Sequence, residues 1–307
     1  MADEHNSLDR RAALAGAAAA LAGLGLASCI PATPGPAGRF AMRLRIIEAG
    51  ANGVLGASFL DTGSGESVGL NGYARFPHAS SLKLSLAAMV LAREQAGLID
   101  AERTVRWTRE DLMAVSPFTT ERLEQGATLR ELARAAQVSS DNAAANVLLR
   151  ELGGPGALTA FWRSLGDETS RLDRTEPELN LVRPGELRDT TTPDAMARTV
   201  AALLYGPLLD APRRAELRQW LIETGTGLDR VRAGLPAGWP AGDKTGTSLA
   251  SGMGSVYVDI GFVEPPGRAP VTFATYFRAA QQHLRVEPAA QAVLAECGRV
   301  LAQWAAR

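Results

Sequence analysis

The stretch "GSVYVDIGFVE" (residues 254–264) decides the fold class, because its large apolar side chains occupy every second position. Such alternation is typical of a β-strand, whose side chains point in turn to the two faces of a sheet. The alternating residues are Val256, Val258, Ile260 and Phe262. A second apolar run, "PVTFATYF" (270–277), follows across a Pro-Pro-Gly turn, so the two runs predict an antiparallel hairpin.

The rest of the chain is organised around this hairpin. Residues 43–71 contain short apolar runs broken by Ala-Asn-Gly and Gly-Ser-Gly, which indicates another antiparallel pair near the N-terminus. Between the two strand regions, from about residue 80 to 225, apolar residues recur at helical spacing, and residues 288–307 form a closing amphipathic helix. We therefore predict an α+β fold: one antiparallel sheet built from both chain termini and flanked by helices, with an inserted all-helical subdomain.

The composition excludes several classes of function. The chain has 307 residues, of which 46% are hydrophobic and 21% charged, and its net charge is −1. No basic surface for nucleic acid is expected from this balance. Two cysteines and three histidines show no metal-ligand spacing, so we expect neither a metal nor another cofactor.

Residues 1–28 are predicted to be an export signal and not part of the fold. An arginine pair, Arg10 and Arg11, precedes an uncharged run of Ala, Leu and Gly, which favours secretion by the twin-arginine route. The run ends in Leu-Ala-Ser-Cys, which resembles a lipoprotein box that would place a lipid on Cys29. An ordinary signal peptide with a chance cysteine is the alternative.

Processing before Cys29 would leave a Pro/Gly-rich tether over residues 29–40 and a folded domain over 41–307. Cys297 would then have no partner, so the domain has no internal disulfide. These features predict a periplasmic monomer that contacts the membrane only through its lipid.

Lysine is rare in this chain, and both lysines lie in suggestive positions. The chain has two lysines among 32 basic residues. Unlike a guanidinium, an ammonium loses its proton readily when it is desolvated. Ser80 and Lys83 stand three apart at the start of a predicted helix, within reach of each other, so a neutral Lys83 could activate the Ser80 hydroxyl. By itself so short a spacing is more often found between two ordinary helix residues.

Two further clusters have the same ambiguity. Lys244 precedes the strand hairpin in "AGDKTGT" (241–247), where a cation, hydroxyls and a flexible glycine could receive a carboxylate, or could form a solvated turn. Ser140 and Asn142 lie in "VSSDNAAAN", where Ser, Asp and Asn commonly cap a helix.

Together the three motifs carry more information than each one alone. Ser-x-x-Lys, Ser-Asp-Asn and Lys-Thr-Gly, in this order, form the signature of class A β-lactamases and penicillin-binding proteins. From about Arg43 to the C-terminus the sequence resembles a class A serine β-lactamase. The stretches "SPFTTERL" (116–123), "RLDRTEPELN" (171–180) and "RDTTTP" (188–193) also match the family's pattern.

The resemblance implies hydrolysis of the β-lactam amide through an acyl-serine, with resistance to β-lactam antibiotics as the result. Ser80 would attack the lactam, and its proton would pass to Lys83 or, through a water, to Glu176; sequence leaves this choice open. Ser140 would relay the proton to the lactam nitrogen, and Glu176 with Asn180 would direct water onto the ester. The implied substrate-binding residues are Asn142, Asn180, Arg230, Lys244, Thr245, Gly246 and Thr247.

The chain also departs from the family's pattern. Val115 stands where an aromatic residue usually forms the pocket mouth. Ala79 and Ser248 occupy the positions of a cysteine pair found in the carbapenem-hydrolysing branch, although Arg230 matches that branch. The family also implies an ion pair between Arg174 and Asp189 across the neck of the loop that carries Glu176.

Two other functions remain open at this point. A cell-wall D-alanyl-D-alanine peptidase of the same superfamily would share Ser80, Lys83 and Lys244 but would not need Glu176. A non-catalytic lipoprotein could bind β-lactam or peptidoglycan as a sensor, although every expected catalytic position is filled here.

Overall fold

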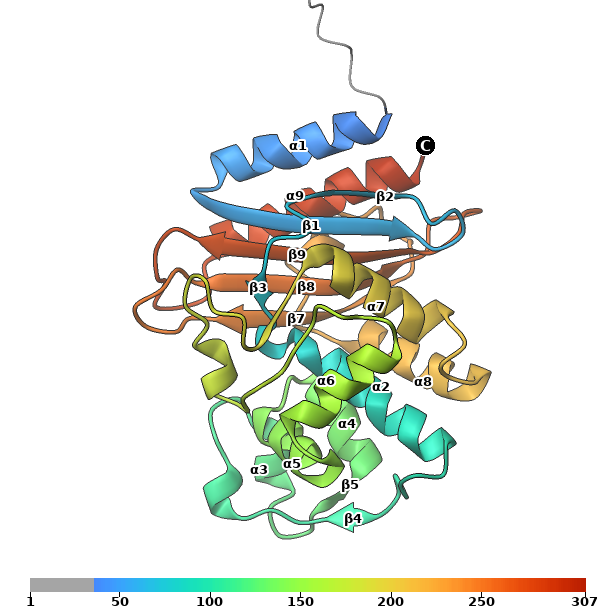
Figure 1. Cartoon of the computed structure of the whole chain (residues 1–307), viewed down its shortest axis with the longest axis vertical. Coiled ribbons are helices and arrows are strands. Elements are labelled where there is room, and N and C mark those ends of the chain that lie inside the picture. Colours follow the sequence, from blue (N-terminus) through green and yellow to red (C-terminus); the bar gives the residue numbers. More distant parts are fainter. Residues whose placement is uncertain (1–35) are drawn as a thin grey trace, which may run out of the picture. The chain divides into compact units, whose positions relative to one another are not determined.

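A computed structural model describes residues 36–307, and the compact unit spans Gly35–Arg307 (Figure 1). The predicted signal peptide, Cys29 and the first part of the tether lie outside the described residues. All buried residues of the two hydrophobic cores belong to this unit. None of the helices in residues 36–307 combines the length and apolar character needed to cross a bilayer.

A five-stranded antiparallel sheet confirms the predicted α+β class. Its order is β2 (Ser67–Leu70), β1 (Gly53–Asp61), β9 (Val271–Ala279), β8 (Val256–Val263) and β7 (Ala241–Ser248). Pairing of β1 with β9 joins the two ends of the chain, as predicted. Two small ladders, β3 (Phe76–Pro77) with β6 (Thr190–Thr191) and β4 (Thr104–Val105) with β5 (Ala127–Thr128), lie outside this sheet.

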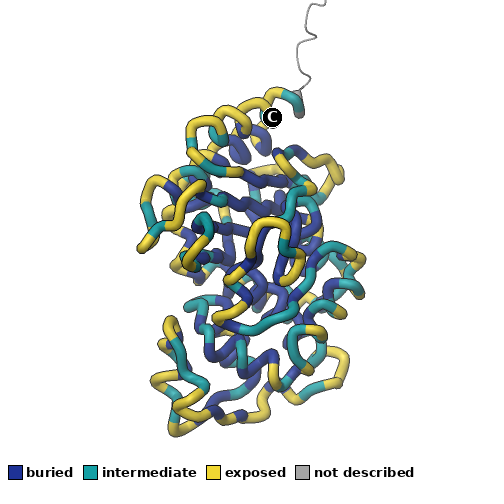
Figure 2. The backbone as a smooth tube through the Cα atoms, turned by 60° about the vertical axis from the view of Figure 1, so that its left-hand side comes forward, coloured by how far each residue is buried: buried dark blue, intermediate teal, exposed yellow. Residues whose placement is uncertain are grey.

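The alternation in residues 254–264 places successive side chains of β8 in two different cores. Val256, Val258, Ile260 and Phe262 enter the larger core, which they share with the helical region. Tyr257 and Val263 enter a second core beneath the C-terminal helix. The strand β8, which lies between β9 and β7, is therefore buried on both faces, and the sheet separates the two cores. In Figure 2 the strands of this sheet are mostly dark blue, the colour of buried residues.

Helices cover both faces of the sheet. The α-helices are α1 (Pro36–Gly50), α2 (Leu82–Gln95), α3 (Pro117–Glu121), α4 (Leu129–Val138), α5 (Asn142–Leu152), α6 (Pro155–Ser164), α7 (Pro193–Tyr205), α8 (Ala211–Glu223) and α9 (Pro288–Ala305). Short 3₁₀ turns are η1 (Ala79–Ser81), η2 (Arg109–Asp111), η3 (Glu178–Asn180) and η4 (Val231–Gly234). Helices α1 and α9 pack together on one face, and α7 packs on β1 and β9.

Two details differ from the sequence-based expectation. The chain is already helical from Pro36, within the range expected to be a tether, and "RLRIIEAG" (43–50) is helical rather than extended. Phe40, Leu44 and Ile47 recur at helical spacing and pack on the second core, which explains the helix. In addition, α7 and α8 pack on the sheet, so the inserted helical region is centred on α2, α4, α5 and α6.

Candidate active site

The three predicted motifs meet at the β7 edge of the sheet, where η1 and the start of α2 approach the strand. Gly246 makes this approach possible, because a Cβ there would lie 2.8 Å from the His78 carbonyl oxygen and 3.1 Å from Ser80 N. The sequence favoured flexibility as the role of this glycine. Close packing of β7 against the turn that carries Ser80 is the observed role.

Ser80 and Lys83 are in direct contact, as their spacing predicts. The Lys83 Nζ donates to Ser80 Oγ at 3.0 Å, to the Ser140 carbonyl oxygen at 2.9 Å and to Asn142 Oδ1 at 2.5 Å. The side chain is completely buried, and this burial lowers the pKa of Lys83, while the Glu176 carboxylate acts in the opposite direction. Such a lysine is suited to accept a proton.

Glu176, on the loop 171–189, approaches both Ser80 and Lys83. Its Oε1 is 3.4 Å from Ser80 Oγ and 3.3 Å from Lys83 Nζ, and the residue is 3% exposed. The Asn180 amide donates to Glu176 Oε2 at 2.6 Å. Glu176 therefore contacts Ser80 through one carboxylate oxygen while Asn180 binds the other.

Asn146 is a further positioning residue that the sequence analysis did not identify. Its side-chain amide donates to the Glu176 carbonyl oxygen at 2.8 Å and accepts from Glu176 N at 2.9 Å. This two-point contact fixes the backbone of the loop against α5. Its position one helical turn after Asn142 could have indicated that its side chain lies on the same face of the helix.

The loop neck is closed by the expected ion pair. Arg174 Nε and Asp189 Oδ2 are 2.5 Å apart, and Asp189 Oδ1 also accepts from the backbone amides of Asp173 and Arg174. Asp173 pairs with Arg171, whose guanidinium lowers the pKa of that carboxyl. Glu178, a further acidic residue of this loop, is exposed.

Ser140 bridges the two lysines. Its Oγ accepts from Lys244 Nζ at 3.1 Å and lies 3.5 Å from Lys83 Nζ. Lys244 is also completely buried, and its pKa is lowered well below the usual value, first by desolvation and then by the Lys83 cation. The hydroxyl is thus placed where a proton could pass along the pocket.

Arg230 reaches the same strand from η4. Its guanidinium donates to Thr247 Oγ1 at 2.6 Å and to the Gly246 carbonyl oxygen at 2.8 Å, and the residue is 3% exposed. Thr245 Oγ1 is 2.7 Å from Thr226 Oγ1. The strand β7 therefore carries two threonine hydroxyls and the buried Lys244, and Arg230 adds a second buried cation next to Thr247.

The departures from the family pattern are visible in the structure. Val115 is exposed and has a left-handed backbone with φ of 60°, which is unfavourable for a β-branched residue. Its carbonyl oxygen accepts from Asn142 N at 2.8 Å. Ser248 Oγ donates to the Asn180 carbonyl oxygen at 2.9 Å, so this contact joins β7 to the loop without a disulfide. Cys297 is buried and forms no disulfide within residues 36–307.

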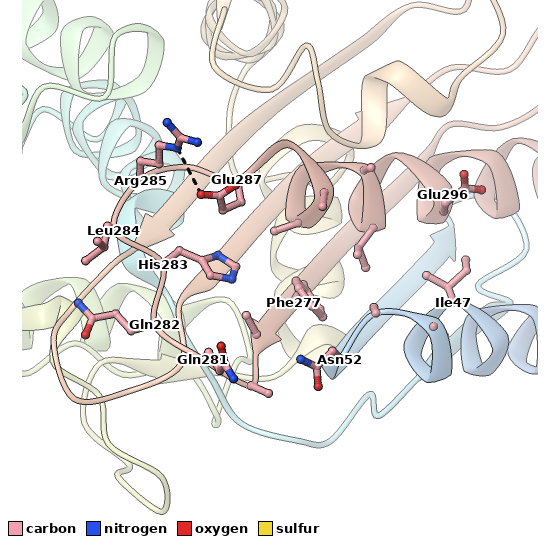
Figure 3. Close-up of a pocket in the computed structure, with 18 of the residues that line it drawn as sticks. Ile47, Asn52, Phe277, Gln281, Gln282, His283, Leu284, Arg285, Glu287 and Glu296 are labelled. Carbon is pink, nitrogen blue, oxygen red and sulfur yellow. Dashed lines mark hydrogen bonds and ion pairs between the residues drawn. The ribbon is translucent and has the colours of Figure 1, made fainter.

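A separate hollow of about 1100 Å³ lies between the end of α1, the loop after β9 and the first turns of α9 (Figure 3). Ile47, Phe277 and His283 are among its lining residues. It contains none of the predicted catalytic or substrate-binding residues.

Comparison with known proteins agrees with this geometry. The model of the β-lactamase enzyme family matches residues 39–305. A carbapenem-hydrolysing β-lactamase KPC of Klebsiella oxytoca is 44% identical, over 83% of this chain and 85% of that protein. The β-lactamase AST-1 of Nocardia asteroides is also 44% identical, over 84% and 81%. An ancestral class A β-lactamase structure superposes with a TM-score of 0.81 at 45% identity, covering 86% of this chain and 99% of that one.

Proposed function

Because the chain belongs to the class A β-lactamases and therefore hydrolyses β-lactams through an acyl-serine, we propose that Ser80 is its nucleophile. Ser80 Oγ is the hydroxyl that both Lys83 and Glu176 approach. Attack on the lactam carbonyl forms an ester with Ser80 and breaks the ring C–N bond. The antibiotic is inactivated, which confers resistance.

Proton transfer uses the two groups that contact the nucleophile. Lys83, desolvated and 3.0 Å from Ser80 Oγ, takes the hydroxyl proton in the direct route, and Glu176 takes it through water in the alternative route. Ser140 passes a proton to the departing nitrogen, because its Oγ lies next to both lysines.

Strand β7 binds the substrate and stabilises the developing charge. The backbone N–H groups of Ser80 and Thr247 form the oxyanion hole, a device whose single donors contribute about 10²–10³ in rate. Lys244, Thr245 and Thr247 receive the substrate carboxylate, and Arg230 supports Thr247 from behind. Asn142 holds the acyl amide, with its own amide nitrogen placed by the Ala114 carbonyl at 2.9 Å.

The contact between Glu176 and Ser80 is the observation that carries hydrolysis over peptide transfer. A carboxylate 3.4 Å from the acylated oxygen, itself held by Asn180, can activate a water for attack on the ester. A transpeptidase would gain nothing from that base.

We further propose an exported monomer, anchored in the periplasm by lipid on Cys29.

Turnover of a chromogenic cephalosporin tests the assignment of the nucleophile. Ser80→Ala should abolish turnover, whereas Ser85→Ala, which removes an unpartnered buried hydroxyl one turn further along α2, should retain it. Labelling of the unmodified enzyme by one equivalent without turnover would instead indicate the peptidase.

Intact mass of the exported protein tests the anchor: an N-terminus other than Cys29, or no acyl mass, would contradict it.

A further inference from the structure

One side of α1 combines arginines with exposed apolar residues. Figure 2 shows that much of this helix is exposed. We call this side the α1 outer face and define it as Arg39, Met42, Arg43, Arg45 and Ile46. All five are exposed, Met42 by 47% and Ile46 by 65%. A single exposed apolar residue on a helix is ordinary. Met42 and Ile46, however, lie on adjacent turns of the helix and form one apolar stripe.

The order of these residues around the helix is that of an interfacial helix. Successive residues are about 100° apart, so Met42 and Ile46 lie one above the other in the middle of the face. Arg39 and Arg43 flank this pair on one side, and Arg45 flanks it on the other. Helices that lie in the surface of a bilayer place apolar residues between cations in this way.

The positive charge of the face is not neutralised within the described chain. Among residues 38–307, no carboxylate lies within 4.0 Å of Arg39, Arg43 or Arg45. The acidic residue of α1, Glu48, is turned inward: its Oε1 accepts from Leu55 N at 3.0 Å and from Asn71 Nδ2 at 2.8 Å. The guanidinium groups are therefore available to an external anion.

We propose that the α1 outer face docks on an anionic phospholipid bilayer. The arginines would bind lipid phosphates, while Met42 and Ile46 enter between the headgroups. Ile46 also borders the hollow of Figure 3 together with Ile47 and Val293, so the apolar surface continues beyond the helix. A second protein copy would bring the same unneutralised arginines together, which makes a lipid surface the better match.

The position of the face in the chain supports this partner. Pro36, where α1 begins, comes seven positions after Cys29, a contour of at most about 25 Å. A lipid on Cys29 would thus hold α1 next to the bilayer; this step alone rests on the proposed anchor. Helix α1 packs on β2 and α9, whereas the catalytic residues lie at β7, the opposite edge of the sheet (Figure 1). Docking would leave the active site open to solvent.

Vesicle binding without the acyl group separates the face from the anchor. The test protein is residues 29–307 with Cys29→Ser, which contains the whole compact unit. It should sediment with phosphatidylcholine vesicles that contain phosphatidylglycerol and stay in solution with phosphatidylcholine alone. Raising the ionic strength toward about 1 M, where the Debye length is about 3 Å, should release it. Equal binding to both vesicles, or binding to neither, would overturn the proposal.

Charge reversal then locates the contact. One arginine near an anionic surface strengthens binding about fivefold, so reversing three should weaken it at least about a hundredfold. The variant carries Arg39→Glu, Arg43→Glu and Arg45→Glu. The matched control makes the same charge change on exposed arginines of the helical region, with Arg103→Glu, Arg106→Glu and Arg109→Glu.

The control should bind far better than the outer-face variant, and equal losses in the two would refute the assignment. Met42→Ser with Ile46→Ser should also weaken binding to the anionic vesicles. All variants should hydrolyse a chromogenic cephalosporin like the parent, which verifies their fold. A dimer in solution that Ile46→Ser abolishes, without vesicle binding by the parent, would assign the face to self-association instead.

Discussion

Replacing Glu176 by Gln should separate the two chemical steps of the reaction. The amide keeps the size of the side chain and can still contact Asn180, but it cannot accept the proton of the hydrolytic water. Loss of a general base commonly costs about 10²–10⁴ in rate, or about 2.7–5.5 kcal/mol in the barrier. We expect deacylation to slow by this factor.

Acylation should suffer much less, for a reason visible in the structure. Lys83 remains 3.0 Å from Ser80 Oγ as a second base. Glu176 is also the main group that opposes the burial-induced lowering of the Lys83 pKa, so its neutralisation makes the neutral amine more populated. Ser80 should therefore still open the lactam, and the acyl-enzyme should accumulate.

Mass spectrometry after mixing with benzylpenicillin would detect this adduct on Ser80, and stopped-flow kinetics would show a burst followed by slow turnover. Glu178→Gln is the matched control, since it makes the same change two residues away on an exposed side chain, and it should behave like the parent. If Glu176→Gln turns over at the parental rate, Glu176 is only a loop carboxylate and the assignment is wrong.

Three further changes test the surroundings of the site. Gly246→Ala should lower kcat/KM about 10²-fold, because the new Cβ would meet the His78 carbonyl oxygen at 2.8 Å and displace β7; Gly225→Ala, which meets nothing within 4 Å, should not. Burial lowers the pKa of His78 from its usual 6.5 to about 4. At a pH between these two values, the unfolded chain therefore binds a proton at His78 that the folded chain does not. The free energy of unfolding should therefore fall by up to roughly 3 kcal/mol as the pH drops through this range, and urea titrations of His78→Leu should lack that part of the slope. Val115→Asn should raise the free energy of unfolding by about 1 kcal/mol in thermal or urea melts, since asparagine tolerates the left-handed φ of 60°; an unchanged value would contradict the strain argument.

The parts of the fold that depend on residues close together in the sequence could be predicted from local patterns. The alternation in residues 254–264 correctly predicted a strand, and the three-residue spacing of Ser80 and Lys83 correctly predicted a direct contact. The helix α1 was missed because its residues 43–50 contain apolar runs that also fit a strand. Only packing of Leu44 and its helical neighbours on the second core decides between the two.

Contacts between distant segments were not readable from local pattern. Ser140 and Lys244 are 104 residues apart, and Asn146 contacts Glu176 across 30 residues. The proximity of Ser140 and Lys244 was predicted from the order of the family's motifs and not from physical reasoning about the residues. Asn146 lies outside those motifs, and its role emerged only when α5 and the loop were placed side by side.

The charges of the site support the proposed role of Lys244 in binding the substrate carboxylate. Two buried ammonium groups share the Ser140 hydroxyl, and the pKa of each is lowered first by desolvation. Lys83 has a counter-ion in Glu176 at 3.3 Å. The carboxylate next to Lys244 in the chain, Asp243, is instead paired with Arg232 at 2.7 Å. Within residues 38–307, a charged Lys244 therefore lacks a close counter-ion of its own, and this favours the binding of an anion next to it, as the proposed carboxylate-binding role requires.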